Sequence, residues 1–283
     1  MAAETKLPRR WPAPAKLNLF LHITGRRDDG YHLLQTVFQF LDFGDELVFR
    51  LREDTCIQRL TEVAGVPAEQ DLVVRAARLL SRHRGLARGV DIEINKRLPM
   101  GGGLGGGSSD AATTLVALNR IWECDLSINE LTKLGLQLGA DVPVFIHGQA
   151  AWAEGVGEDL TPVELSEPWF VVLIPPVNVS TAKVFADPQL IRDCPAITIR
   201  DFLSGRGGNV CEPLVRQGWP EVDAALRDLS EFASARMTGT GACVFAAFER
   251  EDEANSAWQQ LSGKWAGFVA RGKNTSPLRQ VVN

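Results

Sequence analysis

The stretch Leu98-Pro-Met-Gly-Gly-Gly-Leu-Gly-Gly-Gly-Ser-Ser-Asp-Ala-Ala112 says more about the fold than any other part of the chain. It places six glycines between a strand pattern that Pro99 closes and a helical pattern that runs from Ser109 to Trp122. Glycine permits positive φ and leaves the backbone open to a ligand, while a helix start offers unpaired N–H groups and roughly half a positive charge. We therefore expect a phosphate-binding loop followed by a helix that Ser108 caps. A flexible turn or a close helix packing contact is the alternative.

This loop does not match the common nucleotide-binding motifs. A P-loop needs Lys directly after the last glycine, where this chain has Ser108. A dinucleotide fingerprint is matched by Gly101, Gly103 and Gly106, but the acid expected about twenty residues later should end a second strand, and Glu123 instead lies between two helical segments. No His-Arg-Asp or Asp-Phe-Gly signature of the protein kinases follows the loop.

Periodicity outside the loop predicts a mixed α/β or α+β protein. Residues 13–24 alternate as a strand and lead through a turn at 27–30 into a β-rich stretch that ends near Phe49, with Lys16, Asn18 and Phe20 on one face. The remaining patterns predict strands at 89–95, 169–174 and 243–248, and helices at 71–80 with Asp71 as N-cap, from 127 with a Ser127/Glu130 capping box, at 221–232 and at 252–261.

Length and composition indicate an ordinary soluble enzyme. The chain has 283 residues, which predicts one or two domains, and 45% hydrophobic with 23% charged residues excludes a disordered or fibrous protein. Turn residues accumulate at 155–162, where we expect the domain boundary, and residues 1–10 are expected to form a mobile tail.

Charge and cysteine content restrict partners and compartment. A formal net charge of −5 gives no global field that would attract nucleic acid or anionic lipid. The N-terminus has no apolar signal region, and the longest apolar run, 169–177, is too short to span a bilayer. Five scattered cysteines without a Cys-x-x-Cys pair argue against disulfides or a zinc site. We expect a cytoplasmic protein with no nucleic-acid or membrane partner, and the sequence leaves its oligomeric state open.

Four motifs occur together: Pro14-Ala-Lys16-Leu-Asn18, the loop 99–112, Gly139-Ala-Asp141-Val-Pro-Val-Phe145, and Thr238-Gly-Thr-Gly-Ala-Cys-Val-Phe245. From Trp11 to Pro277 the chain resembles the GHMP superfamily of galactokinase, homoserine kinase, mevalonate kinase and phosphomevalonate kinase. Within it, the resemblance is to the branch that phosphorylates the 2-hydroxyl of 4-diphosphocytidyl-2-C-methyl-D-erythritol in the non-mevalonate isoprenoid pathway.

The resemblance implies a two-domain α+β GHMP kinase fold. A ribosomal-protein-like, ATP-binding N-terminal domain would comprise residues 1–157, and a ferredoxin-like substrate domain residues 158–283. ATP would be the phosphoryl donor, bound by the loop residues Pro99, Met100, Gly101, Gly102, Gly103, Leu104, Gly105, Gly106, Gly107, Ser108 and Ser109. ATP chemistry implies Mg²⁺, which Ser108 or Ser109 would reach. No set of carboxylates with metal-ligand spacing is visible, so no protein metal ligands are assigned.

Asp141 and Lys16 are the candidate catalytic residues. Asp141 is a lone acid in the apolar stretch 138–146, so patterning places it inward, where a charge needs a partner. Phosphoryl transfer to an alcohol requires a group near the hydroxyl to take its proton. The resemblance implies that Lys16 orients the Asp141 carboxylate and neutralises the transferring phosphoryl group. On spacing alone, Asp141 is equally well a helix N-cap and Lys16 a solvated strand residue.

The substrate end rests mainly on the resemblance. Tyr31 and His32 follow a turn, and an aromatic ring with a bifunctional imidazole can stack on and hydrogen-bond a pyrimidine; ordinary packing is the alternative. The resemblance implies a cytidine site at Tyr31, His32 and Phe185. Further substrate candidates are Asn18, Val156, Thr181 and Gly239. Lys96 is expected to contribute through its backbone, with Asp71-Leu72 in the adenine region.

Two other functions remain open at this point. One is a different small-molecule kinase of the superfamily, of the homoserine or mevalonate type, against which Lys16 and the Tyr31-His32 pair argue. The other is a non-catalytic nucleotide-binding regulator, which would keep the glycine loop but lack a base such as Asp141.

Overall fold

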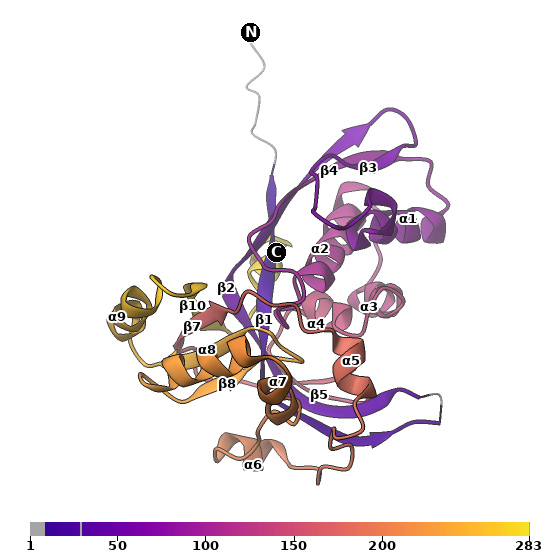
Figure 1. Cartoon of the computed structure of the whole chain (residues 1–283). Helices are drawn as coiled ribbons and strands as arrows, with labels where there is room; N and C mark the ends of the chain where they lie inside the picture. The colour runs from indigo at the N-terminus through magenta and orange to yellow at the C-terminus, as the bar shows by residue number, and fades with distance from the viewer. Residues whose placement is uncertain (1–8, 29, 283) are drawn as a thin grey trace.

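The fold is organised around two long antiparallel strands, β1 (Arg10–Arg26) and β2 (His32–Arg52), which cross the whole molecule (Figure 1). The computed structural model describes residues 9–28 and 30–282. Both strands were predicted from alternation, and both are longer than the pattern suggested. Residues 1–8 of the predicted tail lie outside the described residues, and Arg10 already belongs to β1.

The other strands extend this pair on both sides into one sheet with the order β3-β4-β2-β10-β7-β9-β8. Strands β1 and β5 also pair with β2, and β6 pairs with β5. Strand β10 joins the two halves, because it pairs with β2 at Gly272 and Lys273 and with β7 over its earlier residues. The strands are β3 (Ile57–Arg59), β4 (Gly89–Asn95), β5 (Ala151–Glu154), β6 (Asp159–Pro162), β7 (Trp169–Ile174), β8 (Ala235–Met237), β9 (Val244–Phe248) and β10 (Ala266–Lys273).

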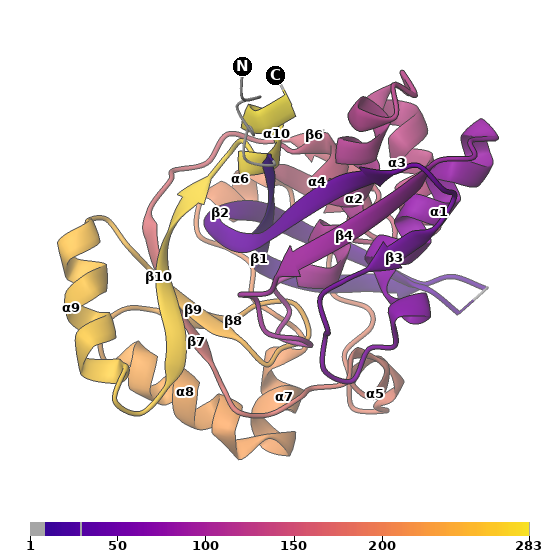
Figure 2. The same cartoon turned by 90° about the horizontal axis from the view of Figure 1, so that it is seen from above.

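Helices cover the two halves separately. In Figure 2, α1 to α4 gather beside β1 to β4, whereas α8 and α9 lie beside β7 to β10. The helices are η1 (Ala68–Gln70), α1 (Leu72–Arg84), α2 (Gly106–Ile121), α3 (Ile128–Leu136), α4 (Val142–His147), α5 (Thr181–Ala186), α6 (Ile199–Leu203), α7 (Glu212–Gly218), α8 (Pro220–Ser230), α9 (Glu251–Leu261) and α10 (Pro277–Val282).

Local signals decide where the first helices begin. Asp71 caps α1 by accepting a hydrogen bond from the backbone N–H of Val73, and Ser127 and Glu130 form the predicted capping box of α3. The expectation that Ser108 caps α2 is wrong. Helix α2 starts at Gly106 and Gly105 is its N-cap residue, with φ of +74°, a conformation that glycine adopts at little cost.

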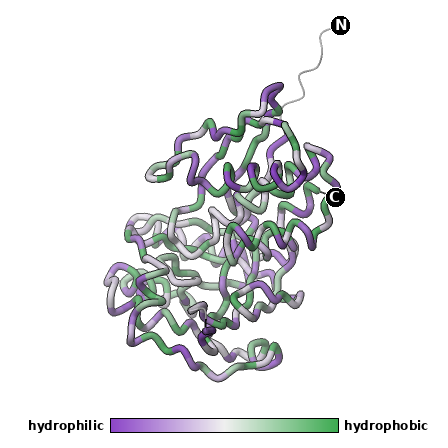
Figure 3. The backbone as a smooth tube through the Cα atoms, turned by 90° about the vertical axis from the view of Figure 1, so that its right-hand side faces the viewer, coloured by the Kyte–Doolittle hydropathy of each residue, from purple (hydrophilic) through white to green (hydrophobic). Residues whose placement is uncertain are grey.

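Three large groups of buried apolar side chains hold these layers together. One lies between α1 to α4 and the sheet, a second fills the other half, and a third joins them through residues such as Leu17, Leu104 and Phe245. Figure 3 shows hydrophobic and hydrophilic residues interspersed along the chain. Among the described residues, no helix combines the length and the apolar character that crossing a bilayer requires.

The predicted boundary region forms a hairpin. Residues 155–158 connect β5 to β6, and β6 extends the sheet of the first half. At the other end of the chain, Leu278 of α10 packs into the apolar core of the first half. The division at residue 157 therefore stays a prediction, and β6 and α10 pack with the first half although they follow it in sequence.

Candidate active site

A cavity of about 1000 Å³ opens where the two halves meet. The glycine loop (residues 99–107) and the start of α2 form its middle, together with Lys16 and Asp141. One end is lined by the segment before α1 and by Lys96, and the other by Tyr31, His32 and Phe185. In Figure 1 these ends correspond to the α1 side and to the α5 side of the molecule.

The glycine loop packs so closely against residues of both halves that side chains would not fit at two of its glycines. A Cβ on Gly103, whose φ is +77°, would lie 2.3 Å from the carbonyl oxygen of Thr238, and a Cβ on Gly105 would lie 2.8 Å from the ring of Phe145. Helix α2 starts directly after Gly105. Its first N–H groups and the positive end of its dipole therefore lie at the cavity, as an anion site requires.

Nine of the eleven loop residues predicted to bind ATP line the cavity, and two do not. Leu104 is 1% exposed because its side chain packs in the core between the halves. Ser109 is fully buried and its hydroxyl has no hydrogen-bond partner. With α2 starting at Gly106, Ser109 is turned about 100° from Ser108, and only Ser108 of these two serines lines the cavity.

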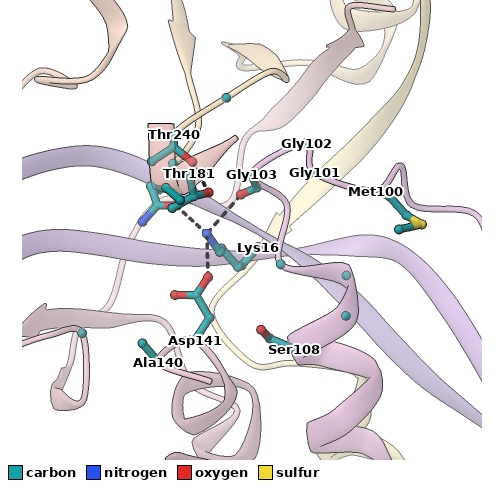
Figure 4. Close-up of a pocket in the computed structure, with 18 of the residues that line it drawn as sticks. Lys16, Met100, Gly101, Gly102, Gly103, Ser108, Ala140, Asp141, Thr181 and Thr240 are labelled. Carbon is teal, nitrogen blue, oxygen red and sulfur yellow. Dashed lines mark hydrogen bonds and ion pairs between the residues drawn. The ribbon is translucent and has the colours of Figure 1, made fainter. Parts of the chain in front are cut away.

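Lys16 is fixed in the middle of the cavity by three oxygen atoms (Figure 4). Its Nζ donates to Asn18 Oδ1 at 2.5 Å and to the carbonyl oxygen of Gly103 at 3.0 Å, and it lies 3.3 Å from Asp141 Oδ2. The residue is 3% exposed, so an unpaired ammonium group would be costly there. Asn18 in turn donates to Thr36 Oγ1 at 2.9 Å, which sets the direction of the amide oxygen that faces Lys16.

Asp141 holds the N-cap position of α4 but does not use its side chain as a cap. Its backbone has helical angles, φ −83° and ψ −12°, and no cap hydrogen bond forms. The carboxylate instead faces Lys16 and is 37% exposed. The predicted pairing of the two residues is therefore present, and the open face of the carboxylate leaves room for a second group.

The loop 238–241 supports the same centre from the other half. Thr238 Oγ1 accepts a hydrogen bond from the backbone N–H of Asn18 at 3.0 Å and lies 3.3 Å from the oxygen of Gly103. Asn209 Nδ2 donates to the carbonyl oxygens of Met237 and Gly239 and so anchors this loop. Gly239, a predicted substrate-binding residue, lines the cavity beside Asn18.

The predicted substrate residues all line the cavity, and they are Asn18, Tyr31, His32, Val156, Thr181, Phe185 and Gly239. The rings of His32 and Phe185 stack at a centroid distance of 5.0 Å. Tyr31 is 64% exposed at the rim. Thr181 shares a 2.8 Å hydrogen bond with Thr240. Phe20, expected on the face of Lys16 and Asn18, instead packs against Trp152 beyond a register shift of β1.

A second cluster of charges lies beneath the glycine loop. Lys96 Nζ donates to Asp45 Oδ2 and, at 2.9 Å, to Asp110 Oδ2, and the two carboxylates are 0% and 5% exposed. Asp45 also accepts from the backbone N–H groups of Arg97 and Leu98. This cluster ties β2 and the end of β4 to α2. The ammonium group of Lys96 is thus engaged in this cluster, and the expected backbone contribution of Lys96 at the adenine end stays a prediction.

Burial dominates the electrostatics of this cluster. Loss of solvent and the nearby Asp45 carboxylate raise the pKa of Asp110 to about 7, against the opposing effect of Lys96. Burial alone would lower the pKa of Lys96, but Asp110 and Asp45 raise it above its usual value. One oxygen of Asp110 has no hydrogen-bond partner.

Sequence reasoning missed the wall of the cavity at the α1 end. Val63, Val66 and Gln70 line it, and nothing in the irregular segment between β3 and α1 marks them. Asp71 caps α1 and pairs with Arg59, so its carboxylate is already engaged. Within residues 9–28 and 30–282, no group of three or more His, Cys, Asp or Glu side chains is arranged to hold a metal ion.

Comparisons with known proteins agree with this geometry. The family model "GHMP kinases N terminal domain" matches residues 71–149, and "GHMP kinases C terminal" matches residues 198–267. A 4-diphosphocytidyl-2-C-methyl-D-erythritol kinase of Nitrosococcus oceani is 60% identical over 95% of this chain and 96% of the relative. The kinase of the same name from a Pseudomonas aeruginosa strain is 57% identical over 95% of each chain.

Solved structures give the same result at the level of the fold. A crystal structure of 4-(cytidine 5'-diphospho)-2C-methyl-D-erythritol kinase matches with a TM-score of 0.81 and 32% identity, over 93% of this chain and 99% of that one. A mevalonate kinase, at 14% identity and a TM-score of 0.69 over 95% and 99% of the two chains, shares the fold. The chain therefore belongs to the GHMP kinases, ATP-dependent small-molecule kinases of two-domain α+β fold, and within them to the 4-diphosphocytidyl-2-C-methyl-D-erythritol kinase family.

Proposed function

We propose that this enzyme transfers the γ-phosphoryl group of ATP to the 2-hydroxyl of 4-diphosphocytidyl-2-C-methyl-D-erythritol, giving the 2-phosphate and ADP for the non-mevalonate isoprenoid pathway. The observation that carries the proposal is the Lys16–Asp141 pair, 3.3 Å apart beside the glycine loop. The names of relatives that are 57% to 60% identical over almost the whole chain support the choice of substrate.

Asp141 is the general base in this proposal. The Asp141 carboxylate accepts the proton of the substrate 2-hydroxyl while the oxygen of that hydroxyl forms a bond to the γ-phosphorus. The bond from the γ-phosphorus to the bridging oxygen breaks, and ADP leaves. Lys16 neutralises negative charge on the transferring group, and the hydrogen bond from Nζ to Asn18 Oδ1 keeps the ammonium group in place.

The glycine loop and the first turn of α2 hold the phosphates. Residues Gly101 to Gly107 apart from Leu104 line the cavity, and their backbone N–H groups with the α2 dipole favour an anion there. Mg²⁺, bound together with ATP, would supply positive charge that offsets the negative charge of the transferring phosphate. The Ser108 hydroxyl is the hard oxygen donor of the loop that suits this ion. Ser109 is unsuited to that role because its hydroxyl is buried away from the cavity.

The cytidine part of the substrate would lie at the α5 end. Stacked aromatic rings favour a flat heterocycle, and His32 and Phe185 present such rings in the cavity with Tyr31 at its rim. Val156 and Thr181 are further substrate candidates in the cavity lining, and Gly239 lies beside Asn18. The α1 end, with Val63, Val66 and Leu72, is left for the adenine. We also propose a cytoplasmic location, since ATP is the donor and the cysteines are unpaired.

The direct test supplies purified protein with Mg-ATP and 4-diphosphocytidyl-2-C-methyl-D-erythritol and follows ADP release. Homoserine and mevalonate serve as control alcohols, since kinases for these substrates share the fold. We expect ADP to form with the cytidine compound and not with homoserine or mevalonate. ADP that forms only with a control alcohol would contradict the substrate, and ATP binding without turnover of any of the three would favour the regulator alternative.

A further inference from the structure

Arg192 lies behind the two rings that line the α5 end of the cavity. Its guanidinium group donates to three backbone carbonyl oxygens, from Nη1 to Leu190 at 3.0 Å and from Nη2 to Phe185 at 2.9 Å and to Asp187 at 2.6 Å. A fourth hydrogen bond runs from its Nε–H to His32 Nε2 at 3.2 Å. One side chain thus joins the segment after α5 to the start of β2.

The bond from Arg192 to His32 determines the protonation state of the imidazole. Arginine carries only donors, so His32 Nε2 must accept and carries no hydrogen. The ring is then neutral, with its single hydrogen on Nδ1. Burial, Arg192 and Arg26 also lower the pKa of His32, which agrees with a neutral ring.

The same guanidinium group sets the position of Phe185. Because Arg192 holds the carbonyl oxygen of Phe185 and the ring nitrogen of His32 at once, it fixes the distance between the backbone of one residue and the ring of the other. The two rings stack at 5.0 Å with an interplanar angle of 18°. Both rings line the cavity, whereas Arg192 is not among the lining residues.

We infer that Arg192 is a positioning residue for the pyrimidine end of the substrate: it fixes His32 as the Nδ1–H tautomer and holds Phe185 in register with it. The inference rests on the proposed function, because it assigns the α5 end to the cytidine. Arg192 acts through His32 and Phe185, in the manner of outer residues that orient the groups which touch a ligand.

The first readout is the tautomer of His32 in the free protein, which needs no substrate. The chain has four histidines, so long-range ¹⁵N–¹H spectra of histidine-labelled protein resolve each ring, and His32→Gln assigns the His32 signal by its loss. We expect the Nδ1–H pattern in the wild type and its loss in Arg192→Met. An Nε2–H pattern in the wild type, or an unchanged Nδ1–H pattern in Arg192→Met, would overturn the inference.

The second readout is steady-state kinetics with both substrates. Arg192→Met and the charge-conserving Arg192→Lys should each raise KM for the cytidine substrate about tenfold, the ratio equivalent to about 1.4 kcal/mol, with kcat and KM for ATP near wild type. Lysine keeps the charge but lacks the planar set of donors. Arg88→Met is the matched control, because Arg88 also donates to a backbone carbonyl, that of Trp122, and does not line the cavity.

These outcomes separate the inference from the function on which it rests. No turnover of the cytidine compound by the wild type would contradict the proposed function, while the tautomer spectra would still decide whether Arg192 controls His32. Normal KM in both Arg192 variants, or equal losses for both substrates and for Arg88→Met, would show that Arg192 is only a structural tie and would refute its positioning role.

Discussion

Two lysine–aspartate centres lie beside the glycine loop, and they differ in how their carboxylates meet solvent. At the first, Lys16 is 3% exposed but its partner Asp141 is 37% exposed and faces the cavity. At the second, Lys96 lies between Asp45 and Asp110, whose side chains are 0% and 5% exposed. We call the first an open pair, because its carboxylate faces the cavity, and the second a closed cluster, because both its carboxylates are buried, although Lys96 is 23% exposed and lines the cavity.

The difference indicates what each centre can do. An open carboxylate can accept a proton from a second molecule, and a buried lysine beside it stays ready to meet a phosphate. In the closed cluster both carboxylates accept from one lysine, and the cluster holds three chain segments together. Breaking such a cluster leaves an uncompensated buried charge. We expect the first centre to control turnover and the second to control stability.

The largest expected effect is a difference in kcat when the same substitution, Asp to Asn, is made at each of the two centres. Asp141→Asn removes the proton acceptor and should lower kcat by about 1000-fold, within the range for loss of a general base. Nucleotide binding should persist, because the glycine loop is untouched. Asp110→Asn, the matched control, should retain kcat within about tenfold, since an amide oxygen can still accept from Lys96. Both constants follow from ADP release under saturating substrates, with ATP binding measured by calorimetry.

Equal loss of kcat in the two variants would remove the distinction between an open and a closed centre. Near-normal turnover of Asp141→Asn would remove Asp141 from the mechanism.

A smaller effect is expected on stability from the closed cluster. Asp45→Ala leaves the backbone N–H groups of Arg97 and Leu98 without their acceptor, and it leaves Lys96 Nζ with Asp110 alone. The free energy of unfolding in urea should fall by about 3 kcal/mol. Asp42→Ala is the control on the same strand, because its hydrogen bond with the backbone of Arg271 is exposed and water can replace it. A loss for Asp45→Ala no greater than for Asp42→Ala would show that the cluster does not hold the loop.

The smallest expected effect is a dependence of stability on pH that arises from Asp110. Its folded pKa of about 7 lies above the ordinary value of 3.8, so between these values the folded protein binds more protons than the unfolded chain. The contribution of Asp110 to stability is therefore present at low pH and declines as pH rises through about 7. Its slope is at most about 1.4 kcal/mol per pH unit.

This effect is measured as the difference between wild type and Asp110→Asn in urea unfolding from pH 5 to 8. The free energy of unfolding of the wild type, relative to the variant, should decrease with rising pH. A constant or increasing difference would contradict the assignment of this pKa to Asp110.

The comparison also shows how far sequence reasoning reaches. Asp141 was found because it is a lone acid in an apolar stretch, and the same logic applies to Asp110, which stands among small residues of α2. Such a pattern predicts that an acid needs a partner, but not whether the pair will face a cavity. Whether the pair faces a cavity depends on segments far apart in sequence. Asp45, for example, comes from β2, and Lys96 from the position directly after β4.

The elements were predicted well because their signals are local. Alternation identified β1 and β4, the apolar run 169–174 identified β7, and the cap residues Asp71 and Ser127 marked α1 and α3 correctly. The start of α2 was placed too late. Ser109, which the resemblance placed in the site, is turned about 100° from Ser108 and is buried. Arg192 and Val63 have no local signal, because one donates chiefly to backbone carbonyls and the other lies in an irregular segment.

The terminal phosphate and the 2-hydroxyl meet Lys16 and Asp141 together only when both substrates are bound. A crystal structure with a non-hydrolysable ATP analogue and 4-diphosphocytidyl-2-C-methyl-D-erythritol measures this arrangement directly. We expect the terminal phosphate over the glycine loop with Lys16 Nζ within about 3 Å of its oxygen, and the 2-hydroxyl at a similar distance from Asp141. A phosphate outside the loop, or a 2-hydroxyl that contacts another residue and lies out of reach of Asp141, would contradict the account.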